Sequence, residues 1–94
     1  MAMRFIHLGV YFEKPGAPSQ DTIQEVLNEA TDWYRYAPNC WLIYTNNNAR
    51  VWSDRLKAIP GMQDTTSFFI CEVDLSNRGG WIRQTVWDWI NKQR

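Results

Sequence analysis

The stretch Arg4-Phe-Ile-His-Leu-Gly-Val-Tyr-Phe12 decides the expected fold of this chain. Side chains alternate along a strand, so the even-numbered apolar residues of this stretch face one way and the odd-numbered ones the other. Both sets contain apolar or aromatic side chains. A strand of this kind is typically central in a sheet, with one face covered by helices.

The composition is that of one small globular domain, expected to span 1–94. The chain has 94 residues, of which 45% are hydrophobic, and its ten acidic and ten basic residues cancel. A neutral balance argues against the basic field of a general nucleic-acid binder, and no apolar run approaches the length of a membrane span. No signal-peptide pattern is present at the N-terminus, so we expect a cytoplasmic protein. Six Trp, four Tyr and four Phe are many for this length and suggest surface that is buried against a partner.

The remaining pattern predicts the element order β-α-β-β-α-β-α. Apolar residues at helical spacing follow the Pro- and Gly-containing loop 13–19, and two strands follow at 33–36 and 40–45. A second helical stripe ends at Pro60-Gly61, a strand is expected over 66–75, and a helix over 81–92. This order is typical of an α+β, ferredoxin-like βαββαβ sandwich with an additional C-terminal helix. In its strand order, 4-1-3-2, the first and third strands are central.

The face of the sheet opposite the two helices is expected to be too apolar to stay in water. We expect Phe5, His7 and Tyr11 on it, together with Phe68 and Ile70. The sequence leaves open whether Trp41 and Ile43 or Leu42 and Tyr44 join them, because it does not fix the register. Either the C-terminal helix or a second copy of the chain can cover this face. We favour the second copy, since two-fold dimers are the commonest oligomers.

Several short motifs together resemble a known group of proteins. They are the Lys14-Pro15-Gly16 loop, Cys40-Trp41-Leu-Ile43, Phe69-Ile-Cys-Glu-Val73 and Trp87-Asp-Trp-Ile90, together with Trp33 and Arg55-Leu56. This set resembles the SinR-like proteins, small ferredoxin-like chains related to the CRISPR adaptation endonuclease, which dimerises through its sheets. The resemblance extends over nearly the whole chain and implies a ferredoxin-like homodimer.

The resemblance also implies an alternative function, a metal-dependent nuclease. The related endonucleases carry an Asp near the end of the first strand, which binds a divalent metal at the dimer axis. Here Tyr11 occupies that position, and Glu13 lies two residues further on. A Glu13 carboxylate from each chain is the weak candidate for holding Mg²⁺, and no cofactor is expected otherwise.

The prediction for function is a non-catalytic homodimeric binding or regulatory protein, with a small nucleotide as the candidate ligand in a pocket shared by the two chains. Cations and aromatic planes suit such a ligand. The segment 76–80 before the last helix, with Arg78, is a candidate anion site. The predicted ligand-binding residues are Lys14, Arg35, Trp41, Arg78 and Trp81. The other alternative is a structural dimer that binds a protein partner.

Overall fold

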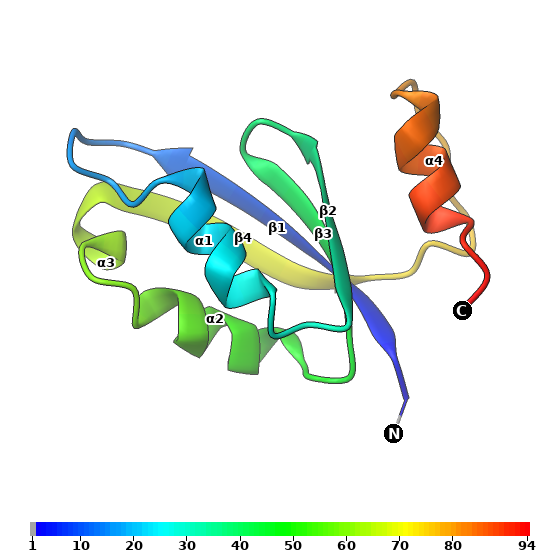
Figure 1. The fold of residues 1–94 in the computed structure, drawn as a ribbon, viewed down its shortest axis with the longest axis horizontal. Helices are drawn as coiled ribbons and strands as arrows, with labels where there is room; N and C mark the ends of the chain where they lie inside the picture. The colour runs from blue at the N-terminus through cyan, green and yellow to red at the C-terminus, as the bar shows by residue number, and fades with distance from the viewer. Residues whose placement is uncertain (1) are drawn as a thin grey trace.

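A computed structural model describes residues 2–94 as one antiparallel sheet with helices on both of its faces (Figure 1). The strands are β1 (Arg4–Phe12), β2 (Asp32–Ala37), β3 (Cys40–Thr45) and β4 (Thr66–Val73). The helices are α1 (Gln20–Leu27), α2 (Ala49–Lys57), α3 (Met62–Thr65) and α4 (Gln84–Ile90). The α+β class is therefore as predicted, while the short α3 was not expected.

The strands are arranged in the order β2-β3-β1-β4, and each neighbouring pair is antiparallel. β1 and β3 are thus the central strands, as the sequence predicted. Their partners fix which side chains share a face, because directly opposed residues of an antiparallel pair point the same way. Ile6 is opposite Ile43, and Leu8 is opposite both Trp41 and Ile70.

The main core lies between this face and helices α1 and α2. Side chains from β1, β3 and both helices are buried there: Ile6, Leu8, Val10, Ile23, Leu27, Trp41, Ile43, Trp52 and Leu56. Figure 1 shows α1 and α2 next to each other, with α4 standing apart from them beyond β2 and β3. The local signals for these helices are as expected. The Ser19 side chain caps α1, the Asn48 side chain caps α2, and Gly61 adopts a positive φ of 82° after the end of α2.

The predicted position of Phe68 and Ile70 is wrong. Ile70 is paired with Leu8 and Phe68 with Val10, so both side chains lie on the face covered by α1 and α2, where they pack against the main core. Phe69 and Cys71 point the other way instead. Both faces of β4 are rich in apolar groups, so hydrophobicity alone did not distinguish the two registers.

Candidate functional site

The candidate site is the face of the sheet opposite α1 and α2, called the second face below. The register places on it Phe5, His7, Gly9 and Tyr11 of β1, Asp32 and Tyr34 of β2, Cys40, Leu42 and Tyr44 of β3, and Ser67, Phe69, Cys71 and Val73 of β4. The open question about β3 is thereby settled in favour of Leu42 and Tyr44. Helix α4 covers part of this face and leaves the rest in solvent, so the face has a covered half and an uncovered half.

The covered half is a second, smaller core beneath α4. Val86 and Trp89 of α4 and Leu42 of β3 are each no more than 7% exposed. The Trp89 ring contacts the Phe5 ring edge-on, with 5.9 Å between centroids, and it lies 6.0 Å from the ring of Tyr34. Phe5, predicted to contact a second copy of the chain, therefore contacts the C-terminal helix of its own chain.

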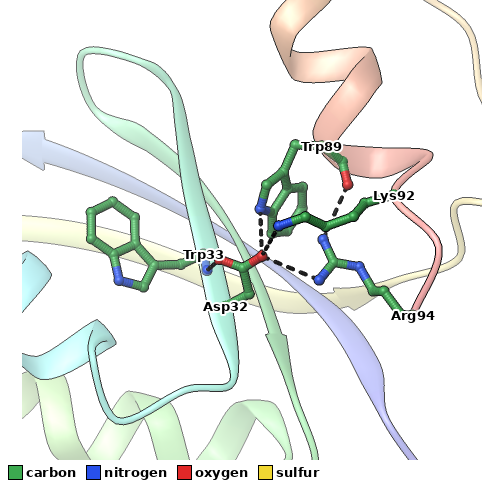
Figure 2. A network of polar contacts seen from close by, with 5 residues as sticks. All are labelled: Asp32, Trp33, Trp89, Lys92 and Arg94. Atoms are coloured by element: carbon green, nitrogen blue, oxygen red, sulfur yellow. Dashed lines mark hydrogen bonds and ion pairs between the residues drawn. The ribbon is translucent and has the colours of Figure 1, made fainter.

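A polar network joins the start of β2 to the C-terminal segment (Figure 2). One carboxylate oxygen of Asp32, Oδ2, accepts hydrogen bonds from Trp89 Nε1 at 2.9 Å, Arg94 Nη1 at 3.2 Å and Lys92 Nζ at 3.4 Å. Its other oxygen accepts from the backbone N–H of Trp33 at 2.9 Å. Asp32 thus satisfies four donors, three of them from α4 or the residues that follow it.

The guanidinium of Arg94 packs over aromatic rings at this end of the second face. It lies 4.4 Å from the ring centroid of Tyr44 and 4.6 Å from that of Trp89, within cation–π range of both. Its Nη2 also donates to the backbone carbonyl of Trp89 at 3.0 Å. Partial burial of Asp32 opposes its ionisation, but the bonds from Arg94 and Trp33, with the charge of Lys92 and the bond from Trp89, outweigh it and lower the pKa of Asp32. We interpret this cluster as the set of contacts that holds α4 against the sheet, and not as a reactive centre.

The uncovered half contains two large exposed side chains beside a shallow recess. Tyr11 is 68% exposed and Phe69 is 69% exposed. Between them and the β2–β3 turn lies an open groove of about 390 Å³, whose floor includes Gly9 and Cys40. Gly9 has no side chain, so its position forms a recess next to the protruding aromatic rings. Phe69 was not among the predicted site residues, because its direction depends on the register of β4.

His7 and Tyr36 form a pair at the boundary between the two halves. His7 Nε2 and the Tyr36 hydroxyl are 2.5 Å apart. Burial lowers the pKa of His7, and burial together with Cys40 raises the pKa of Tyr36 to about 12. Both side chains are consequently neutral at pH 7 and are bonded to each other. The predicted interface residue His7 is therefore occupied by a contact within its own chain.

The five predicted ligand-binding residues do not converge. Trp41 is fully buried and its indole N–H donates to Gln24, so it offers no surface to a ligand. Trp81 lies in the loop before α4 and is fully exposed. Arg78 donates to the carbonyl of Leu75 at 2.7 Å and to the side chain of Asn91, so it holds its own loop against the end of α4.

The other two predicted residues lie in different places. Lys14 is exposed in the loop between β1 and α1. Arg35 lies on the edge strand β2 and lines a groove together with Arg83. Arg83 was not predicted, because it reaches this groove only through the docking of α4.

Glu13, the weak candidate for a metal ligand, follows β1 and accepts a hydrogen bond from the Ser67 hydroxyl. Within residues 2–94, no three His, Cys, Asp or Glu side chains are grouped so that they could hold a metal ion. The carboxylate is therefore paired with a hydroxyl of the neighbouring strand in this chain.

Comparison of the chain with protein-family models, with curated proteins and with solved structures finds no match. Over the part of the chain that the structure describes, no helix has both the length and the apolar character needed to cross a bilayer. What the protein binds has to be inferred from its own surface.

Proposed function

We propose that this protein is a non-catalytic binding protein that forms a homodimer through the uncovered half of the second face. The observation that carries the proposal is the pair Tyr11 and Phe69, two aromatic side chains more than two-thirds exposed on one side of a sheet. Aromatic residues are enriched in protein interfaces because they bury a large area with few rotatable bonds. An exposed aromatic pair beside a shallow, largely apolar recess favours a protein contact.

A second copy of the chain suits this surface because the surface is complementary to itself. A two-fold contact places the same patch of both chains together, so it needs a projection and a recess on one patch. Phe69 is the projection, and the floor at Gly9 and Cys40 is the recess. The formal net charge is zero, so two chains approach without overall repulsion.

The size of the uncovered half indicates a weak dimer. Four strands about 4.8 Å apart and about 25 Å long give a sheet face of roughly 500 Å², and the uncovered half is only part of it. A standard interface buries about 800 Å² on each partner. We therefore expect a dissociation constant in the micromolar range rather than a permanent dimer.

Within this proposal the fold is a ferredoxin-like sandwich, and the chain is related to the SinR-like proteins. The strand order β2-β3-β1-β4 and the packing of α1 and α2 on one face support the first point. Pairing through the sheet is what the resemblance implies. The contact differs from the one expected from sequence, since α4 leaves Tyr11 but covers Phe5.

Sedimentation velocity between about 10 μM and about 1 mM protein tests the dimer. We expect the sedimentation coefficient to rise with concentration for the native chain. The double variant Tyr11→Asp/Phe69→Asp should stay monomeric throughout, because two carboxylates would be buried against their copies. Trp81→Asp is the control, since it places a charge on a fully exposed aromatic position elsewhere and should dimerise normally. A native chain that remains monomeric over the whole range, or a double variant that dimerises as well as the native chain, would refute the proposal.

A further inference from the structure

We propose that a groove at the edge of β2 binds a phosphate-bearing small molecule between Arg35 and Arg83. The groove has a volume of about 400 Å³ and is open to solvent. It lies within one chain and away from Tyr11 and Phe69, so the inference goes beyond the proposed dimer and can fail separately from it.

The walls of the groove come from parts of the chain that are far apart in sequence. They are Gln20 at the start of α1, Arg35, Tyr36 and Ala37 of β2, Pro38 of the β2–β3 turn, and Arg83 just before α4. The Gln20 side chain donates to the Pro38 carbonyl at 2.5 Å and to Asn39 Oδ1 at 3.4 Å. These bonds hold the start of α1 against the turn, so this wall of the groove is preformed.

An irregularity in β2 places Tyr36 and Ala37 on the second face in succession, while Arg35 lines the groove from the other face of this edge strand. In a regular strand two successive side chains point to opposite faces. Here the pairing with β3 shifts between Arg35 and Ala37, so that Arg35 is opposite Trp41 and Ala37 is opposite Cys40. Bulges of this kind redirect side chains and are common near functional sites. The hydroxyl of Tyr36 is hydrogen-bonded to His7 of β1, which fixes the orientation of the Tyr36 ring.

The charges of the groove are not neutralised within the chain. Arg35 and Arg83 are both exposed, and in residues 2–94 neither guanidinium has an ion pair or a hydrogen-bond acceptor. No Asp or Glu is among the described residues that line the groove. Arg4 and Arg94, by contrast, are paired with Glu72 and Asp32. Two like charges that line one groove favour a multivalent anion between them.

Phosphate fits this arrangement better than a carboxylate does. Each guanidinium offers a planar pair of donors that matches two phosphate oxygens, and two guanidiniums match the double charge of a phosphate group. Tyr36, Ala37 and Pro38 add an apolar side to the groove, suited to the organic part of a phosphorylated molecule. A nucleoside diphosphate is therefore a suitable probe, with pyrophosphate as the probe for the phosphate contacts alone.

Calorimetric titration of the full chain with pyrophosphate and with ADP tests the inference. We expect binding that weakens as salt is added, since the contacts are solvent-exposed charges. Arg35→Gln and Arg83→Gln should each weaken binding about tenfold or more, because each removes a charge-assisted pair of hydrogen bonds. Arg50→Gln is the matched control, an exposed arginine of α2 that also has no ion pair. Circular dichroism should show all three variants folded.

The two probes distinguish affinity for the phosphate groups from affinity for the organic part of the ligand. Equal binding of pyrophosphate and ADP supports recognition of the phosphate groups alone, and tighter binding of ADP supports a phosphorylated ligand whose organic part contacts the apolar side. Absence of binding for both probes at millimolar concentration would overturn the inference. An equal loss in Arg35→Gln and Arg50→Gln would also overturn it, because the effect would then reflect net charge and not this groove.

Discussion

At the scale of single residues, one carboxylate decides where the C-terminal segment lies. Asp32 Oδ2 accepts from Trp89, Lys92 and Arg94, three donors of different chemistry that come from one end of the chain. The indole needs a partner because Trp89 is almost buried, and the two cations need a counter-charge. Their common acceptor explains why α4 lies over the β2 side of the second face and leaves Tyr11 free.

Asp32→Asn is expected to lower the free energy of unfolding by about 1–2 kcal/mol at pH 7, because two ion pairs and one charge-assisted hydrogen bond are weakened. The folded pKa of Asp32 is below the unfolded value of 3.8, so its contribution is complete above pH 3.8 and is lost as the pH falls through the folded pKa. Urea unfolding of both proteins from pH 7 downward measures the difference. Asp54→Asn, an exposed carboxylate of α2, is the control and should change stability by less than about 0.5 kcal/mol. Equal stability of Asp32→Asn and the native chain at pH 7 would show that the network does not hold α4.

At the scale of elements, the sequence predicted the strands and the first two long helices well, because their periodicity and their caps agree. The helical spacing of Ile23 and Leu27 and the stop at Pro60-Gly61 are local signals, and both are seen in the fold. The register of β4 and the docking of α4 are not local. The register decides which of the two apolar faces of β4 lies toward α1 and α2, and the docking of α4 depends on an acceptor in a distant strand, Asp32. This is why Phe69 and Arg83 were missed.

The packing of α4 can be tested by comparing two tryptophans only eight positions apart. Trp89→Ala should destabilise the protein by about 3 kcal/mol, since a side chain that is 7% exposed leaves a cavity above Phe5. Trp81→Ala should change stability by less than about 0.5 kcal/mol, because that ring is fully exposed. Amide hydrogen exchange should show faster exchange over Gln84–Ile90 in Trp89→Ala, with α1 and α2 still protected. Similar losses in the two variants would contradict the packing described for α4.

At the scale of the whole molecule, the two proposed binding surfaces are separate. The uncovered half extends over β1, β4 and the start of β3, whereas the arginine groove lies beside the edge strand β2. The two grooves share no lining residue, and they meet only at the β2–β3 turn, where Pro38 lines one and Asn39 the other. The pair His7 and Tyr36 lies between the two surfaces and supports the aromatic wall of the groove from the sheet side.

The floor of the uncovered half gives a test of the dimer that leaves the exposed aromatic side chains in place. Gly9→Val should leave the chain folded, because an added Cβ meets its nearest atom, His7 Cε1, at an ordinary 3.5 Å and β-branched residues are favoured in strands. The new side chain would fill the recess that receives Phe69 of the other copy, and an overpacked contact of this size weakens association about tenfold or more. Sedimentation equilibrium measures the dissociation constant, with thermal unfolding of dilute protein as the check on the fold. Gly79→Val is the matched control, since no atom lies within 4 Å of a Cβ added at this loop glycine, and it should dimerise as the native chain does. If Gly9→Val dimerises with native affinity, the recess is not part of the contact, and the two-fold arrangement built on Phe69 and Gly9 is wrong even if the chain proves to be a dimer.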